Sequence, residues 1–507
     1  MFGRLLCVAL IVGHAACADP PAPPPPSGLD VRHYDLALRL DPATRALQAH
    51  ATLDVRHPDS LTALPLAFEA LTIDTVRVDG VVVVPKRRGS RLSVPLSRGQ
   101  RASQIDIVYH GTPQRGLYSS NYGPQQVVYT DSWPDDGSGW LPGLHHPADP
   151  ATFSLHLTLP LGYEAAASGR LQAVDTLGDA VRYRWRLDVP APSYAFAFAV
   201  ADFSLTEDAP ADTIPVRYYM LAEDSARVDQ LRRTPQALAF FSDLLGPYPF
   251  AGYASVQVPM RFAGMENASA SFLMADLFRT GEAEAVQIHE LAHQWFGNRV
   301  MLADWSDLWL SEGTATYLAT LFYEHADGLD AACHRWVALA ALSSSRRRTH
   351  TALVSQKPMP PEAYLTWVPY DKGASVLHLL RRTLGDEAFF AALRATYQRF
   401  AGRPLATEAF RQLVEAETGR DLSAFFSYWI YSADLPILTT MWDPATRTLS
   451  WTVTGDDGTL ADVPFDLQLR QRGRLRYVGV GEGSAVLSDW DEARPEAHPV
   501  GVMMRVD

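Results

Sequence analysis

The chain has 507 residues, which at about 150 residues per domain predicts roughly three domains. Hydrophobic residues make up 47% and charged residues 20%, values that exclude a disordered, collagen-like or coiled-coil chain. The formal net charge of -13 provides no overall positive field for a phosphate backbone, so we expect no nucleic acid among the partners.

The N-terminus has the pattern of a secretory signal. Arg4 precedes an apolar run at 5–12, and small residues follow at 16–18. We therefore expect residues 1–18 to be removed before Asp19 and the protein to be exported, either to the periplasm or out of the cell. The apolar run is shorter than the about 20 residues that span a bilayer, so no transmembrane segment is expected.

Cysteines and prolines add detail to this N-terminal region. Cys17 offers an alternative to cleavage, a lipid-anchored bacterial N-terminus, although His14 replaces the aliphatic residue expected three positions earlier. Prolines at 20–26 predict a stiff spacer within residues 19–28. The only cysteines are Cys7, Cys17 and Cys333, which excludes a disulfide framework.

Residues 29–208 are predicted to form an all-β domain. Apolar and polar residues alternate in segments such as 34–40 and 153–159, and Gly, Pro and Asp separate these segments. The segment 194–203 is expected to supply one of the last strands. This alternation indicates strands that bury one face and expose the other.

The pattern changes to a mainly helical domain at 209–434 and returns to strands at 435–507. Apolar residues recur at helical spacing in the first part, in the segments 225–245, 282–296, 312–325 and 372–384. Alternation resumes in 449–454, 465–469 and 475–480, which predicts a small β-sandwich. The expected fold class is therefore α+β with several domains.

The strongest functional signal is His289-Glu-Leu-Ala-His293. Residues 283–296 contain no Pro or Gly and predict a helix, on which positions four apart share one face. Both imidazoles can then reach one metal ion, and Glu312 supplies a third ligand after 18 intervening residues. Two His and one Glu leave a fourth position for water, as in catalytic zinc sites, and Glu290 is then the general base.

Four motifs together resemble the aminopeptidase N and leukotriene hydrolase family of zinc metallopeptidases, the gluzincin aminopeptidases. They are Gly-Met-Glu-Asn at 264–267, His-Glu-Leu-Ala-His-Gln-Trp-Phe-Gly-Asn at 289–298, Trp-Ser-Asp-Leu-Trp-Leu-Ser-Glu-Gly at 305–313 and Tyr-Asp-Lys-Gly at 370–373. The resemblance runs from about Tyr34 to the end of the chain. It implies a thermolysin-like catalytic domain, one Zn²⁺ per chain and substrates that are peptides with free N-termini. The sequence resembles a reduced form that lacks the large helical C-terminal domain of most members.

The resemblance also implies roles for matching residues. Glu266 would bind the α-amine of the substrate, which is largely protonated at pH 7. The strand edge at 263–265 would pair with the substrate backbone, although Ala263 replaces the glycine usual in the family. Tyr370 would donate a hydrogen bond to the oxyanion of the tetrahedral intermediate. The expected substrate-binding residues in this motif are Ala263, Gly264, Met265, Glu266 and Asn267.

Asp131 departs from the family pattern. Aligned with the family, the segment Thr-Asp-Ser-Trp-Pro at 130–134 places Asp131 where a glutamine normally lies near the first residue of the substrate. A second acid there could tighten binding of the α-amine or favour basic first residues. A solvated loop aspartate is an equally acceptable interpretation.

Other functions are compatible with parts of the same pattern. A zinc endopeptidase would use the same histidines, but a fixed acid at Glu266 disfavours cleavage of internal peptide bonds. A binding protein without catalysis would be expected to have lost metal ligands, and all of them are present. Epoxide hydrolysis, known for one branch of the family, has no specific support in these residues.

Overall fold

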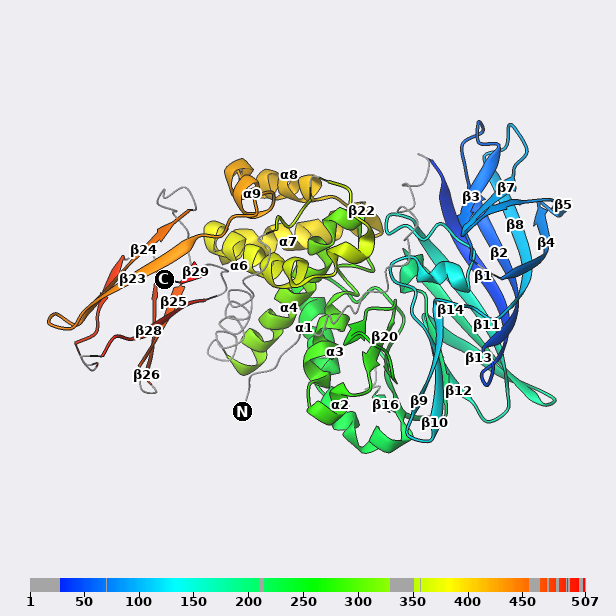
Figure 1. Ribbon diagram of the computed structural model, residues 1–507, viewed down its shortest axis with the longest axis horizontal. Helices are drawn as coiled ribbons and strands as arrows, with labels where there is room; N and C mark the ends of the chain where they lie inside the picture. Colours follow the sequence, from blue (N-terminus) through cyan, green and yellow to red (C-terminus); the bar gives the residue numbers. More distant parts are fainter. Residues whose placement is uncertain are drawn as a thin grey trace.

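The computed structural model describes residues 28–69, 71–208, 214–328, 351–355, 357–455, 466–471, 474–479, 483–488, 490, 493–500 and 505–506. Figure 1 shows an N-terminal β unit, a largely helical central unit and a C-terminal strand unit in a row. This arrangement confirms the predicted fold class. The expected signal, the proline spacer, the possible anchor at Cys17, Cys7 and Cys333 lie outside the described residues, and the domain limits stay predictions.

The N-terminal unit contains three sheets. Its strands are β1 (Asp30–Asp41), β2 (Ala46–Arg56), β3 (Ala63–Ala67), β4 (Thr72–Val78), β5 (Val81–Val83), β6 (Lys86–Arg88), β7 (Arg91–Pro95), β8 (Ala102–Gly111), β9 (Leu117–Tyr122), β10 (Gln125–Thr130), β11 (Pro150–Pro160), β12 (Glu164–Ala167), β13 (Arg170–Leu177), β14 (Ala180–Pro192) and β15 (Phe198–Ala201). The largest sheet has the order β13-β14-β11-β1-β2-β8-β4-β5, and only β1 and β11 pair in parallel. Beside it lie a four-stranded sheet, β12-β15-β10-β9, and a three-stranded sheet, β3-β7-β6.

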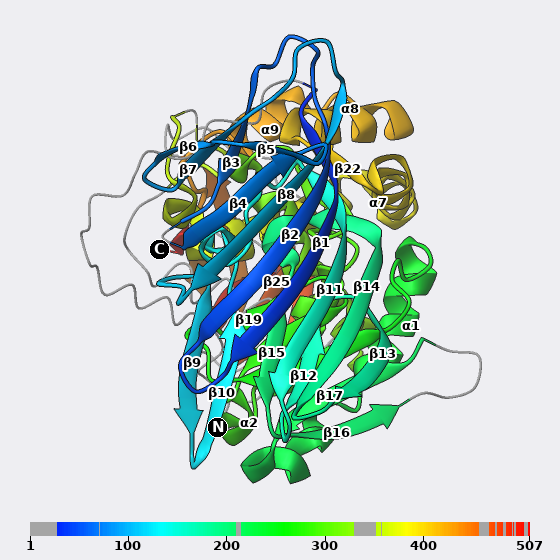
Figure 2. The same ribbon diagram turned by 90° about the vertical axis from the view of Figure 1, so that its right-hand side faces the viewer.

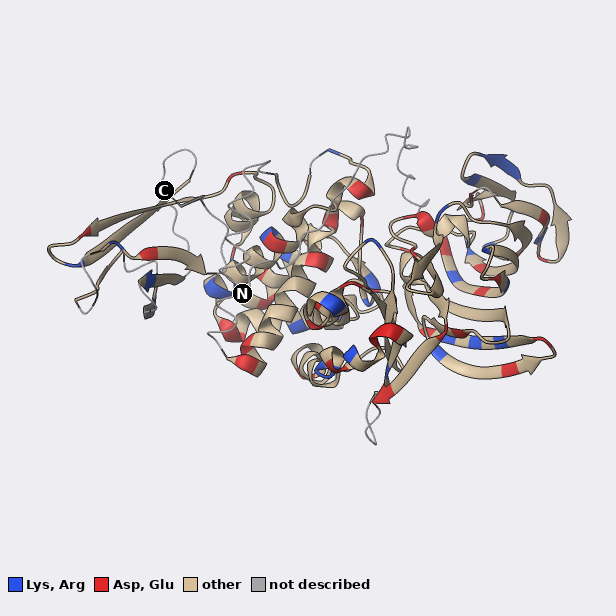
Figure 3. Cartoon of the chain, turned by 60° about the horizontal axis from the view of Figure 1, so that its bottom comes forward, with Lys and Arg blue, Asp and Glu red and all other residues tan. Residues whose placement is uncertain are grey.

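The predicted period of two matches the burial of the long strands. In β1, Leu36, Leu38 and Leu40 are buried, whereas Arg39 between them is exposed. Figure 3 shows charged residues of both signs spread over the β unit and the helices. One-sided burial is why the sequence alone identifies these strands.

The expected strand at 194–203 is wrong in detail. Residues 193–195 form a 3-10 turn, η2 (Ser193–Ala195), before β15, and Phe203 begins β16 (Phe203–Asp208), which belongs to the next sheet. Residues 194–201 are buried throughout rather than at alternate positions. This segment lies where the N-terminal unit meets the central unit, so both of its faces are covered.

The central unit has a five-stranded sheet with helices packed against it. Figure 2 shows this unit behind the large sheet of the N-terminal unit. The other strands of the unit are β17 (Val216–Leu221), β18 (Tyr253–Val258), β19 (Gly264–Met265), β20 (Ala270–Met274), β21 (Val300–Leu302) and β22 (Arg403–Leu405). The sheet order is β16-β17-β18-β20-β19, so β19 is an edge strand, antiparallel to β20. β21 and β22 form a separate parallel pair.

The helices of the central unit follow the predicted segments with two changes. They are η3 (Ala222–Leu231), α1 (Thr234–Leu245), α2 (Leu277–Thr280), α3 (Ala283–Ala292), η4 (Trp305–Asp307), α4 (Trp309–Asp327), η5 (Pro361–Tyr364), the π-helical turn η6 (Val368–Lys372), α6 (Gly373–Leu384), α7 (Asp386–Phe400), α8 (Thr407–Thr418) and α9 (Ser423–Trp429). The single helix predicted at 225–245 is instead η3 followed by α1. Pro235 lies in the first turn of α1, where its missing N–H removes no helical bond. The helix predicted at 282–296 ends early, at Ala292.

The C-terminal unit consists of two small sheets, seen at the left of Figure 1. The strands are β23 (Ile437–Asp443), β24 (Thr448–Thr454), β25 (Asp466–Gln471), β26 (Arg474–Gly479), β27 (Ser484–Val486), β28 (Glu496–Val500) and β29 (Arg505–Val506). Their orders are β27-β24-β23-β29 and β26-β25-β28. Three of them, β24, β25 and β26, coincide with the segments in which the sequence pattern predicted strands.

Contacts between the first two units lie beside the motifs at 264–267 and 305–313. The amide of Ala268 donates to the carbonyl of Ala195 at 2.9 Å, and the amide of Gly169 donates to Ser269 Oγ at 2.7 Å. The rings of Trp133 and Trp305 meet edge to face with centroids 5.5 Å apart. The loop after β19 is therefore held against the N-terminal unit. Among the described residues, no helix combines the length and apolarity needed to cross a membrane.

Candidate active site

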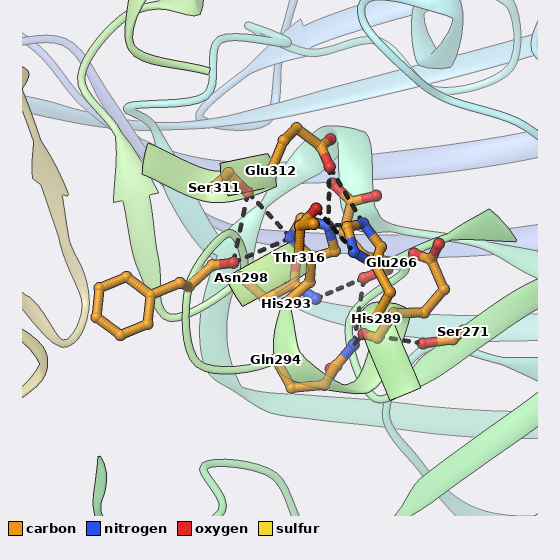
Figure 4. A network of polar contacts seen from close by, with 11 residues as sticks. Glu266, Ser271, His289, His293, Gln294, Asn298, Ser311, Glu312 and Thr316 are labelled. Carbon is orange, nitrogen blue, oxygen red and sulfur yellow. Dashed lines mark hydrogen bonds and ion pairs between the residues drawn. The ribbon is translucent and has the colours of Figure 1, made fainter. Parts of the chain in front are cut away.

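His289, His293 and Glu312 converge on one point (Figure 4). The Nε2 atoms of the two histidines lie 3.1 Å apart, and Glu312 Oε2 lies 3.3 Å from His289 Nε2 and 3.2 Å from His293 Nε2. Donors of tetrahedral zinc with bonds of about 2.0 to 2.1 Å lie about 3.3 to 3.4 Å apart. The triangle therefore fits one zinc ion with respect to both donor type and spacing.

The end of α3 sets the position of the second histidine. His293 is the C-cap of the helix, and the following amides of Gln294 and Trp295 bond to carbonyls three residues back. Gly297 then reverses the chain with φ +130°, and a Cβ there would lie 3.0 Å from His293 Nδ1. This tight reversal next to the imidazole explains why the helix stops before residue 296.

Backbone and hydroxyl groups orient the imidazole of His293. Its Nδ1 lies 3.0 Å from the carbonyl oxygen of Phe296 and 3.0 Å from Ser311 Oγ. A proton on Nδ1 that is donated to the carbonyl leaves the lone pair of Nε2 free to bind a metal. Ser311 precedes Glu312 in the first turn of α4, so the same contact aligns the third ligand with the second.

The site holds an excess of buried negative charge. Glu266, Glu290 and Glu312 are each buried, and none of the ion pairs among the described residues joins them to a lysine or arginine. Burial, reinforced by the other two carboxylates, raises the pKa of Glu290 well above its ordinary value, while His293 opposes this effect. Burial also acts to raise the pKa of Glu312, but His293 and the hydrogen bonds from both histidines lower it overall. Such a pocket favours a divalent cation and an ammonium group.

Glu266 follows the edge strand β19, and two side chains from the end of α3 hold its backbone. Asn298 Nδ2 donates to the carbonyl of Glu266 at 2.5 Å, and Gln294 Nε2 donates to the same oxygen at 3.3 Å. Gln294 Oε1 also accepts from the amide of Ser269 at 2.8 Å. The phenol of Tyr194, from η2, hydrogen-bonds with the carboxylate of Glu266.

Gln294, Asn298 and Tyr194 were not identified from the sequence as residues of the site. Gln294 and Asn298 lie within the quoted histidine motif, and a buried amide beside metal ligands is a signal that could have identified them. Tyr194 gave no such signal, because it comes from the other unit. Asn267, whose amide atoms have no hydrogen-bond partner among the described residues, is fully buried beside Glu266.

The strand edge at 263–265 lies directly against Glu290. Gly264 and Met265 pair with β20, and the carbonyl of Ala263 accepts from the amide of Met274 at 2.9 Å. A Cβ built on Gly264 would lie 2.2 Å from Glu290 Oε1. A larger residue here would displace that carboxylate, so the backbone of the edge strand fixes the position of the carboxylate.

Tyr370 lies in the π-helical turn η6, close to the metal-binding residues. Its ring faces that of His289, with centroids 6.0 Å apart and planes at 25°. Burial and then the charge of Glu312 raise the pKa of Tyr370, so its hydroxyl stays protonated and can donate. An added Cβ on Gly313 would lie 2.8 Å from Gly373 Cα, so α4 and the start of α6 touch backbone to backbone. This contact fixes the separation between the elements that carry Glu312 and Tyr370.

Asp131 lies in the loop after β10 and is buried, which overturns the interpretation as a solvated loop residue. Its Oδ1 has no hydrogen-bond partner among the described residues. Burial, followed by the charge of Asp136, raises the pKa of Asp131 to about 7, and Glu266 adds to the shift. The N-terminal unit thus brings a buried acid, one of whose carboxylate oxygens has no partner among the described residues, near enough to Glu266 for their charges to interact.

Zinc should stabilise this acidic pocket measurably. A ligand that binds only the folded state adds about 2.7 kcal/mol when its concentration is 100 times its Kd. We expect the thermal midpoint to fall by several degrees after chelation and to recover when zinc is returned, as measured by calorimetry. In a His293→Ala variant the midpoint should no longer respond to zinc; an unchanged response would place the metal elsewhere.

The comparisons with known proteins agree with this geometry. The Peptidase family M1 domain matches residues 230–429, and the Peptidase M1 N-terminal domain matches residues 31–195. The crystal structure of an M1 zinc metallopeptidase from Deinococcus radiodurans is 30% identical, with a TM-score of 0.71, over 81% of this chain and 95% of that one. A mutant of that protein has been solved bound to a Tyr-Ser-Ala substrate.

Relatives with assigned activities are more distant. Leukotriene A-4 hydrolase from Xenopus laevis is 27% identical over 78% of this chain and 70% of its own length. Aminopeptidase M1-B from Oryza sativa is 26% identical over 80% of this chain, which spans only 50% of that enzyme. The resemblance seen in the four motifs and the expectation of zinc are both confirmed. The chain therefore belongs to peptidase family M1 and is a zinc metallopeptidase.

Proposed function

We propose that the protein is an aminopeptidase that removes single residues from the N-terminus of peptides. In this proposal His289, His293 and Glu312 hold zinc. Glu290 is the general base, and Tyr370 binds the oxyanion. Aminopeptidases among the relatives and the peptide bound to the Deinococcus radiodurans mutant support the assignment. Because the chain spans about half the length of the aminopeptidase relatives, its activity on whole substrates is part of the proposal.

The spacing between Glu266 and the metal donors carries the proposal. Donor atoms of Glu266, Glu290 and His293 all lie within 4.8 Å of one another. Within one residue the nitrogen and the carbonyl carbon are about 2.5 Å apart, and each further residue adds about 3.8 Å. If the α-amine binds Glu266, the carbonyl that reaches the zinc-binding residues is that of the first residue. The pocket therefore measures one residue from the N-terminus.

Glu290 is placed to move the proton. Zinc, when bound, lowers the pKa of a water molecule and polarises the carbonyl of the scissile bond. The carboxylate of Glu290 takes a proton from the attacking water and later delivers it to the leaving amine as the C–N bond breaks. The raised pKa of Glu290 suits both steps, because the group must first accept a proton and then release it.

Tyr370 and the edge strand complete the arrangement. The protonated hydroxyl of Tyr370 donates to the oxygen on which negative charge develops. The free side of β19 can pair with the substrate backbone, since β19 is the edge of its sheet. Pairing along 263–265 would align the peptide with Glu266 at its N-terminus.

Replacing the general base should separate metal binding from catalysis. Glu290→Gln keeps the shape of the side chain but cannot accept the proton from water. We expect kcat to fall by about 10² to 10⁴ while the zinc content stays at one per chain. Steady-state kinetics and metal analysis on the same preparation check this, and preserved turnover would remove Glu290 from the mechanism.

Removing the carboxylate of Glu266 should lower kcat/KM for peptides with a free N-terminus and not for N-acetylated peptides. Glu266→Ala loses charge-assisted hydrogen bonds of about 1.5 to 3 kcal/mol each, so kcat/KM on free peptides should fall about 10- to 150-fold. N-acetylated peptides, which lack the ammonium, should be poor substrates before and after the change. Equal losses on both kinds of peptide, or cleavage of internal bonds, would favour the endopeptidase alternative.

Asp131 is proposed to favour basic side chains at the first position of the substrate. Its unpartnered Oδ1 and its charge interaction with Glu266, the proposed ligand of the α-amine, support this role. Asp131→Asn should lower kcat/KM at least about 10-fold more for peptides that begin with Arg than for those that begin with Leu. Equal losses on both peptides would instead assign Asp131 to the α-amine.

A further inference from the structure

Lys372 is a buried lysine at the end of the turn that carries Tyr370. Only 2% of its surface is exposed. Its Nζ donates to the carbonyl oxygen of Ser432 at 3.0 Å and to that of Thr351 at 3.3 Å. Burying an ammonium group is costly unless its protons are bound, so these two bonds keep the side chain in place.

The two carbonyls belong to segments that run side by side. The amides of Leu353 and Val354 donate to the carbonyl of Ile430 at 2.9 and 3.3 Å. Ser432 lies in the connection between α9 and β23, where the chain enters the C-terminal unit. Lys372 thus joins the turn η6 to the segment that leads into that unit.

The ammonium of Lys372 remains charged at neutral pH. Burial lowers its pKa to about 8, and the nearby charge of Asp434 opposes this shift. The side chain of Asp434 is itself held by Ser432, whose Oγ donates to Asp434 Oδ2 at 2.9 Å. The charge of Lys372 therefore interacts with that of an acid in the same connecting segment.

The turn η6 is consequently fixed on two sides. On one side Gly373 touches Gly313, the neighbour of Glu312. On the other side the ammonium of Lys372 anchors the turn to the connecting segment. Tyr370 lies two residues before Lys372, so both attachments hold the end of the turn that carries its ring.

We propose that Lys372 is a positioning residue that sets the orientation of the Tyr370 hydroxyl by tying its turn to the connection with the C-terminal unit. This inference rests on the proposed role of Tyr370 as the oxyanion donor. Lys372 does not touch substrate in this account. Lys372 affects turnover only through the position of the Tyr370 hydroxyl.

A double-mutant cycle on the full chain tests this route. Lys372→Met removes the charge at similar length, and we expect kcat to fall about 10- to 100-fold with KM within about twofold, because small misplacements of catalytic groups cost up to about 10². In a Tyr370→Phe background, the same change should lower kcat less than about twofold. Zinc content and thermal midpoint are measured on all four proteins.

The outcomes separate the inference from the function it rests on. Equal losses in both backgrounds would mean a general structural effect and overturn the positioning role, while the impaired Tyr370→Phe variant would leave the oxyanion role intact. Full activity of Tyr370→Phe would overturn both. A fully active Lys372→Met variant would overturn the positioning role alone.

Two further variants serve as a control for the substitution and as a substitute if the first variant does not fold. Lys357→Met makes the same change at an exposed lysine and should leave kcat within about twofold of the unmodified chain. If Lys372→Met does not fold, the cycle is repeated with Lys372→Arg, which keeps the charge but alters the donor geometry. A smaller loss that again disappears in the Tyr370→Phe background supports the inference, and a loss that persists there contradicts it.

Discussion

The central constraint on this structure is the unfavourable free energy of burying three carboxylates close together. Glu266, Glu290 and Glu312 come from a loop and two helices, and their mutual repulsion has to be overcome by the rest of the fold. Among the described residues, the surrounding framework holds them through amides, hydroxyls, a backbone contact and, for Glu312, the two histidines, rather than through lysine or arginine. The negative charge is therefore available to a metal ion and, in the proposed function, to the ammonium group of a substrate.

The same framework explains why the N-terminal β unit is part of the catalytic architecture. Tyr194 reaches Glu266 from the 3-10 turn of that unit, and Asp131 approaches from the loop after β10. The hydrogen bond from the amide of Ala268 to the carbonyl of Ala195 joins the two units beside these side chains. The end of the pocket that contains Glu266 is thus formed where two units meet, whereas His289, His293 and Glu312 come from α3 and α4.

Features set by neighbouring residues could be predicted from the sequence, whereas features set by contacts between distant segments could not. One-sided strands such as β1, and the pair of histidines on α3, are local patterns, so their periodicity is visible in the sequence. The break between η3 and α1, the end of α3 at Ala292 and the complete burial of 194–201 depend on turns and on contacts with distant segments. Gln294, Asn298 and Tyr194 contact Glu266 across such distances, which is why no local pattern identified them.

The hydrogen bonds that hold the backbone of Glu266 also limit how the length of the fragment released in the proposed reaction could change. Asn298 and Gln294, which hold the carbonyl of Glu266, belong to the same short segment as His293. An enzyme that releases dipeptides would need its amine-binding acid to lie about 3.8 Å farther from the scissile carbonyl. Lengthening the loop after β19 would break the two hydrogen bonds that the side-chain amides of Asn298 and Gln294 donate to Glu266. Moving these two side chains instead would disturb the neighbouring His293. If Glu266 binds the α-amine as proposed, the length of the released fragment and the integrity of the zinc site would depend on the same ten consecutive residues, 289–298.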